Sequence, residues 1–349
     1  KRYSIWNFIQ WTRFEIFWFT LYAALVCFVY FYFDLYQFKL PWTSIALIGT
    51  ASAFIIGFQN NAAYERIWEA RKIWGGIVNY SRTFGMKIND MITNEYSERN
   101  YSQEELDTFK DGFITRHIAW MTALRHSLRM AKPWEDVHHH KTNREWMEKA
   151  FIPEKVTTLK DDLNFYLNDE EYRCVINKNN KSASILYQQS KRLRELKEKG
   201  IIWEFSFLEL EAILEEFFNL QGKCERIKNF PYPRQYASLS HIVVRIFLAL
   251  LPFGLIPEFY TIGNEVLSSG NSLGIYFVWM AVPFSVIVSW IFHTMERIGK
   301  FGENPFEGNP NDVPISTIAR AIEIDLRQLY NKDFSKIPCQ FPEHHNIQM

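Results

Sequence analysis

Residues 40–64 read LPWTSIALIGTASAFIIGFQNNAAY, a stretch of 25 residues that contains no Asp, Glu, Lys or Arg. A helix needs about 20 mostly apolar residues to cross the hydrocarbon core of a bilayer. A charged side chain at the centre of such a helix costs at least about 2.5 kcal/mol on insertion scales. Residues 40–64 therefore predict a membrane-spanning helix, and this prediction sets the class of the protein.

Three other segments are predominantly apolar, although the second of them carries Arg245 near one end. Residues 16–33 are uncharged and too long for the apolar part of a cleaved signal peptide, and no small-residue cleavage site follows them. Residues 242–259 contain two prolines, which membrane helices tolerate as kinks, and residues 266–295 form the last apolar run. The sequence predicts a polytopic protein with four spans.

Basic residues are distributed unevenly around these spans. The loop between spans one and two holds only Lys39, and the loop between spans three and four holds no Lys or Arg. The opposite ends are flanked by Lys1, Arg2, Arg13, Arg66, Arg71, Lys72, Arg297 and Lys300. Because basic residues stay on the cytoplasmic side, both termini are predicted to be cytosolic, in the plasma or inner membrane.

Composition indicates that part of the chain is solvated. Aromatic residues make up 17% of the chain, which suits contact with lipid, but the mean hydropathy of -0.20 is too low for a chain wholly inside a bilayer. The net charge of zero gives no indication of a nucleic-acid partner. Four separated cysteines without a CxxC pair argue against disulfides and zinc. The expected regions are 1–64 and 237–295 in the membrane, and 65–236 and 296–349 in the cytosol.

The cytosolic part is predicted to be all-α, since apolar residues recur at helical spacing and no strand alternation is found. A helix from 45 to 91 would be about 70 Å long, twice the membrane thickness, unless Gly75 and Gly76 interrupt it. Further helices are expected at 104–130, 155–167, 181–199 and 203–227. The apolar stripe of the first comprises Phe113, Ile114, His117, Met121, Leu124 and Leu128.

Catalytic motifs are missing from the sequence. It has no phosphate-binding GxxxxGK[ST] loop, no HExxH and no GxSxG, and it carries no His clusters of the kind that membrane di-iron enzymes need. The triplet His138 to His140 is expected in a surface loop, and the basic segment 190–199 on a solvated face or against anionic lipid headgroups. We therefore expect no enzyme and no cofactor, but a passive ion pathway or a membrane scaffold.

Three stretches resemble the bestrophin family. They are FIIGFQNNAAYERIWEARKIWGGIVNYSR at 54–82, PYPRQYASLSHIVVRIFLALLPFGLIP at 231–257, and MERIGKFGENPFEGNPNDVPISTIARAIEIDLRQL at 295–329. They occur in the order of the family, and the NPNDVPI wording is similar to its prokaryotic branch. The resemblance implies a homopentamer that conducts small ions through a central pore, with the second span lining a narrow neck.

The resemblance also implies site residues. In the family, side chains at i, i+4 and i+8 line the neck, which gives Thr50, Phe54 and Phe58 here. A second constriction lies sixteen positions before a cysteine, which gives Leu208 from Cys224. The alternative is that these residues only pack between helices.

Calcium is expected to be at most a weak ligand. Animal bestrophins bind it through backbone carbonyls and an acidic run after NPF. Here that region offers Asn304, Glu307, Asn309 and Asp312, interrupted by Gly308 and Pro310. Calcium prefers six to eight oxygens and several carboxylates, so a structural turn is the favoured interpretation.

The permeant ion is open at this stage. Phenyl rings turned edge-on to a pore present weak positive potential, and an apolar neck disfavours strongly hydrated ions, so chloride and larger anions are expected to be favoured. The alternatives are a cation-selective channel, since some bacterial relatives conduct cations, and a non-conducting scaffold that docks a partner.

Overall fold

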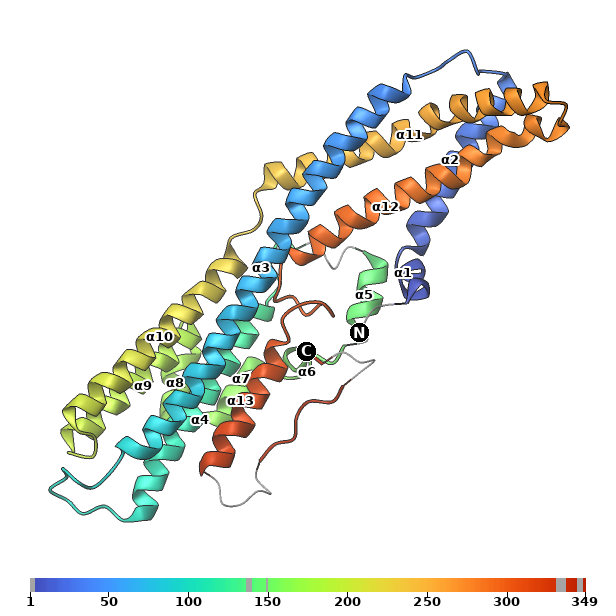
Figure 1. Ribbon diagram of the computed structural model, residues 1–349. Helices are drawn as coiled ribbons and strands as arrows, with labels where there is room; N and C mark the ends of the chain where they lie inside the picture. Colours follow the sequence, from blue (N-terminus) through green and yellow to red (C-terminus); the bar gives the residue numbers. More distant parts are fainter. Residues whose placement is uncertain (1–3, 136–139, 149, 331–336, 344–347) are drawn as a thin grey trace. The chain divides into compact units, whose positions relative to one another are not determined.

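The computed structural model describes residues 4–135, 140–148, 150–330, 337–343 and 348–349, and every regular element within these ranges is a helix (Figure 1). The chain divides into two compact units. The first unit comprises Lys1–Glu65, His139–Asn143 and Pro231–Glu303, and the second comprises Arg66–His138, Arg144–Phe230 and Asn304–Met349. The expectation of an all-α chain is confirmed for the described residues.

The first unit contains the long apolar helices. It begins with α1 (Ile5–Trp11), and the short 3-10 helix η2 (Ser272–Met280) leads into its last helix. The other helices are α2 (Arg13–Phe33), the start of α3 (Trp42–Met91), α11 (Arg234–Ser268) and α12 (Ala281–Gly302). Four described segments are long and apolar enough to cross a membrane: 13–33, 42–91, 234–268 and 272–302. This number agrees with the four predicted spans.

The boundary between the third and fourth spans differs from the prediction. The fourth span was expected from residue 266, but α11 continues to Ser268 and the next helix begins only at Ser272. Gly270 lies between them with φ +89°, a left-handed conformation that glycine adopts without steric cost. The side chain of Asn271 then caps η2 by accepting the N–H of Leu273. Apolar residues on both sides of this turn conceal it from a hydropathy profile.

α3 and α11 approach each other closely at two glycines. A Cβ on Gly49 would lie 2.7 Å from a ring carbon of Phe247, and a Cβ on Gly254 would lie 2.6 Å from Cδ1 of Ile45. Each glycine therefore receives a side chain of the opposite helix. Ile45 and Phe247 are buried together with Val244 and Leu251 in the same cluster.

α3 is a single helix of 50 residues, about 75 Å long at 1.5 Å per residue. Gly75 and Gly76 do not interrupt it. Gly76 instead allows contact with α10 (Glu204–Asn229), where a Cβ would lie 3.0 Å from Cδ2 of Leu220. Glycine destabilises a helix interior because of its conformational freedom. Burial of the neighbouring Trp74 and Ile77 offsets that cost.

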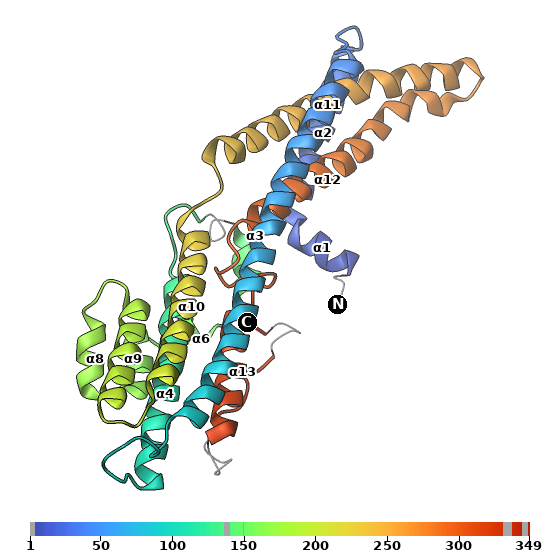
Figure 2. The same cartoon turned by 60° about the vertical axis from the view of Figure 1, so that its left-hand side comes forward.

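The second unit is a helical bundle that packs around α4 (Gln103–Arg129). Figure 2 shows α4 beside α9 (Lys181–Glu198) and α10, with α8 (Asp169–Ile176) next to α9. The remaining helices are α5 (Lys141–Met147), which crosses the unit boundary, α6 (Pro153–Val156), α7 (Leu159–Tyr166) and α13 (Ile315–Tyr330). The predicted stripe on α4 is confirmed, because all six of its residues are buried.

The helix expected at 155–167 is wrong as a single element. α6 ends at Val156, and Thr158 starts α7 by accepting the backbone N–H of Asp161 on its hydroxyl at 3.3 Å. Two consecutive β-branched threonines separate the helices, and threonine favours a cap over a helix interior. The helices α1, α5, α8 and α13 were not predicted from the sequence.

A buried polar network joins three helices of the second unit. Glu171 on α8 accepts from the Arg116 guanidinium of α4 at 2.7 Å, and Arg116 also donates to the side chain of Gln189 on α9 at 2.6 Å. The two charged side chains are only 8% and 6% exposed. A buried charge that loses its partner is strongly destabilising, so this pair fixes how the three helices pack.

We expect Glu171→Gln to lower the free energy of unfolding by about 3 kcal/mol, because it leaves the buried Arg116 charge uncompensated. Glu170→Gln is the matched control, since the neighbouring Glu170 side chain is 75% exposed, and it should change stability by less than about 0.5 kcal/mol. Thermal unfolding of the purified variants measures both. Equal melting temperatures for the two variants would contradict the role of this pair.

Candidate functional site: the neck face of α3

The three predicted neck residues lie on one exposed face of α3. Phe54 and Phe58 are 65% and 71% exposed, and Thr50 is also exposed. The opposite face of the helix, including Ile45 and Ile56, is buried in the first unit. Exposed phenylalanines in the middle of an apolar helix need lipid, another protein surface or a pore beside them. We call Thr50, Phe54 and Phe58 the neck face.

A groove of about 860 Å³ runs along the neck face. Its other wall is made by Phe247 of α11 and by Val288 and Phe292 of α12. Its lining also includes Trp42, Ala46, Gly49, Ala53, Gly57 and Asn61. All of these side chains are uncharged, so an ion beside this surface meets only dipoles and aromatic rings.

The hydroxyl of Thr50 is engaged within the helix. It donates to the carbonyl oxygen of Ala46, with 2.9 Å between the two oxygens. A hydroxyl has one proton and two lone pairs, so only its acceptor positions remain. In this rotamer Thr50 offers no donor to an anion, and the two phenyl rings are the main chemical feature of the neck face.

The end of the neck face is held by contacts that sequence analysis did not identify. The side chain of Gln59 donates to the Glu303 carboxylate at 2.9 Å. A Cβ on Gly299 would lie 2.4 Å from Oδ1 of Asn60, so the glycine allows α12 to approach α3 there. The polar run at 59–61 directly after an apolar segment was the available signal, but it did not indicate a partner 244 residues away in the chain.

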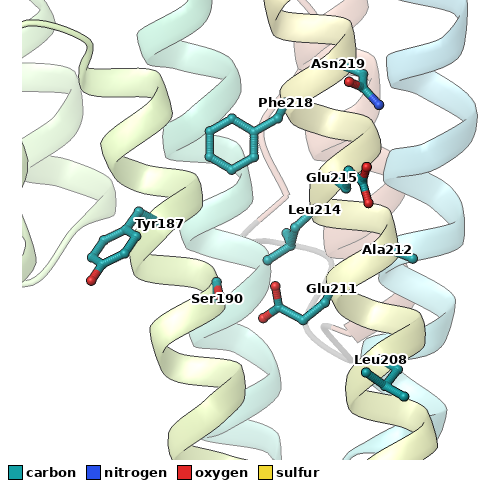
Figure 3. Close-up of a pocket in the computed structure, with 9 residues that line it drawn as sticks. All are labelled: Tyr187, Ser190, Leu208, Glu211, Ala212, Leu214, Glu215, Phe218 and Asn219. Atoms are coloured by element: carbon teal, nitrogen blue, oxygen red, sulfur yellow. The ribbon is translucent and has the colours of Figure 1, made fainter.

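Leu208 belongs to the second unit, whereas the neck face belongs to the first. It is 57% exposed on α10 and borders a pocket of about 460 Å³ between α9 and α10. Figure 3 shows Glu211 and Glu215 on the same helix and Tyr187 and Ser190 on α9. Exposure of a leucine is compatible with a constriction, and its role stays a prediction.

The region after NPF forms a buried turn. The Asp312 carboxylate accepts the backbone N–H groups of Gly308 and Asn309 at 2.8 and 2.9 Å, and Gly308 has φ +93°. Burial raises the pKa of Asp312 to about 7, against the effect of these N–H groups. Burial, reinforced by Asp312, raises the pKa of Glu307 to about 9. Burial therefore disfavours two charged carboxylates side by side in this turn.

Metal ligands are sparse elsewhere too. Within the described part of the chain, no group of three or more His, Cys, Asp or Glu side chains is arranged to hold a metal ion. The weak calcium site expected at Asn304, Asn309 and Asp312 stays a prediction. His138 and His139 lie outside the described residues, so the prediction for that loop is not examined by the structure.

Similar proteins identify the fold. The model of a family described as Bacterial/Fungal Bestrophin protein matches residues 7–328. A crystal structure of a bacterial bestrophin homologue from Klebsiella pneumoniae superposes with a TM-score of 0.71, at 21% identity, over 91% of this chain and 97% of that one. At that identity the likeness establishes the fold and leaves the activity to other arguments.

Curated relatives cover most of the chain. Voltage-dependent anion channel-forming protein YneE of Escherichia coli K12 is 26% identical over 319 residues, which is 88% of this chain and 86% of that protein. Voltage-dependent anion channel-forming protein RSc3414 of Ralstonia nicotianae is 28% identical over 291 residues, or 83% and 78% of the two chains. With the family model matching nearly its full length, this multi-pass, all-helical membrane protein belongs to the bacterial and fungal bestrophin family.

Proposed function

We propose that this protein is a passive ion channel in which several copies of the neck face surround a pore and anions pass in preference to cations. The observation that carries the proposal is the uncharged, exposed aromatic surface of Phe54 and Phe58 on an apolar helix. The relatives named above as anion channel-forming proteins support the same function. They also agree with the lack of catalytic motifs in the sequence.

Anion preference follows from the chemistry of the neck face. The edge of a phenyl ring carries partial positive charge, and rings around an axis add their fields without a formal charge. An apolar constriction penalises the loss of hydration water, and large monovalent anions lose that water at lower cost than small ions. Thr50 does not contribute a donor, since its proton is bonded to Ala46. Leu208 is proposed as a second, aliphatic constriction.

A measurement of ion selectivity tests this function. In liposomes under a salt gradient, the wild-type reversal potential should lie near the chloride potential, and Phe54→Ile should move it toward zero because the ring edges are lost. Phe17→Ile is a matched control, since Phe17 is 60% exposed on α2 outside the groove, and it should leave the potential unchanged. A wild-type potential near that of potassium would establish the cation-selective alternative, and absence of flux would establish the scaffold.

The proposed assembly is a ring of five copies. A single neck face cannot enclose a pore, so a pore requires several copies around an axis. The exposed rings also need contact partners if lipid does not cover them. The mass of the purified protein in a mild detergent, corrected for bound detergent, should equal five chains of 41.6 kDa. A monomer or dimer as the sole species would remove the proposed pore.

The proposed orientation places both termini in the cytosol, on the basis of the Lys and Arg distribution around the spans. A cysteine introduced at Ser269, in the turn before η2, should react with a membrane-impermeant maleimide in intact cells. A cysteine at Asn89, near the end of α3, should react only after lysis. The background carries Cys174→Ser and Cys339→Ser, because these two thiols are exposed. Labelling of the Asn89 site in intact cells would show that the orientation is the opposite of the proposed one.

A further inference from the structure

A pocket of about 410 Å³ lies within the second unit, and none of its lining residues belongs to the groove along the neck face. Its walls come from the end of α4 with Arg129, from Lys155 of α6, from the start of α9, and from Lys228 near the end of α10. α4 packs directly on α6, α9 and α10, so the pocket is built on rigid helices. Its volume is in the range of small-molecule sites.

Positive charge is in excess in this pocket. Five Lys and Arg residues line it against two Glu residues. One of the acids, Glu154, is already bound by Arg125 and Ser316, and one of the cations, Lys228, is paired with Glu135. Arg129 also lies 3.9 Å from Glu154, which leaves Lys132, Lys155 and Lys181 against the single acid Glu225. The surplus favours an anionic ligand.

Arg129 is the most deeply placed of these cations. Its side chain is 4% exposed, and it donates through Nη1 to the carbonyl oxygen of Phe306 at 3.0 Å. Its Nε and Nη2 atoms have no hydrogen-bond partner among the described residues, although Nε lies 3.9 Å from the Glu154 carboxylate. Buried donors without an acceptor are costly, typically about 1–3 kcal/mol or more for charged groups. Both nitrogens are closed to solvent, so an acceptor oxygen in the pocket would reach them after a shift of the Arg129 side chain toward it.

The N-terminus of α9 supplies further donors. The Asn180 side chain accepts the N–H of Ala183, and the Asn180 carbonyl accepts the N–H of Ser184. Lys181 and Ser182 line the pocket. Their N–H groups lie in the first turn of α9, where no carbonyl oxygen of the same helix can accept them. The dipole of this 18-residue helix adds to the positive potential at the same place.

Lys155 belongs to the same electrostatic system. Burial and the nearby Arg129 guanidinium lower the pKa of its ammonium group. Burial alone acts in this direction, and the closeness of the two cations adds to it against the opposing effect of Glu148. A bound anion would remove this repulsion.

We propose that the pocket binds a phosphate group, carried by inorganic phosphate or by a small phosphomonoester. A phosphate dianion presents three or more oxygens, which matches the combination of an Arg fork, Lys ammonium groups and a helix N-terminus. Chloride is a single sphere and cannot satisfy these donors together. The volume exceeds that of phosphate alone, so the pocket has room for a small organic group beside it.

Binding to the purified full-length protein in detergent tests the proposal, with inorganic phosphate and glycerol 3-phosphate as probes in phosphate-free buffer at constant chloride. Calorimetry should give one site per chain. Lys155→Gln and Lys181→Gln should each weaken binding about tenfold or more, because each removes a charge-assisted contact. Lys191→Gln is the matched control, since Lys191 lies on α9 outside the pocket and should leave binding unchanged.

The two probes distinguish the two sources of phosphate. Tighter binding of glycerol 3-phosphate indicates a phosphomonoester, and equal binding indicates free phosphate. Arg129→Gln should weaken binding most, but it also removes the contact with Phe306, so the two lysine variants decide the matter. No heat from either probe at millimolar concentration, or affinities in both lysine variants equal to wild type, would overturn the proposal.

Discussion

The closest approach of α3 and α11 depends on Gly49 and Gly254, where the absence of a Cβ leaves room for the opposite helix. Each glycine accommodates a large residue of the other helix. This reciprocal fit fixes which side of α3 is buried, and therefore which side is left for Thr50, Phe54 and Phe58. The exposed aromatic face is thus a consequence of a packing requirement on the opposite side of the same helix.

The sequence predicted the fold class because its strongest signals are long and local. Uncharged runs of 18 to 25 residues have few structural solutions other than a spanning helix. Element boundaries were less accurate where a turn lies inside an apolar stretch, as at Gly270, or where a short cap divides a helix, as at Thr158. These features depend on the conformation of one residue, which periodicity does not register.

Part of the candidate site could likewise be predicted from the sequence, and part of it could not. Family resemblance indicated the neck residues by their spacing, and the structure places them together on one exposed face. The groove beside them requires Phe247 and Phe292, which come from distant parts of the chain and look like any other apolar residues of a span. Likewise, Arg116 and Glu171 lie 55 residues apart, and nothing local distinguishes them from solvated charges. A single sequence does not show which polar residues pair when they are far apart in the chain.

The continuity of α3 has a consequence for how this chain can change. At 3.6 residues per turn, one inserted residue would rotate everything after it by about 100° relative to everything before it. Phe54 and Phe58 precede the boundary at Glu65, and the buried Trp74, Ile77 and Phe84 follow it. An insertion between Gly49 and Phe54 would therefore turn Phe54 and Phe58 by this angle relative to the side of α3 that packs on Phe247. An insertion between Trp74 and Ile77 would likewise turn Ile77 and Phe84 out of the core of the second unit. Within each unit, the number of residues between the packed positions of α3 is therefore as constrained as the identity of its closely packed glycines.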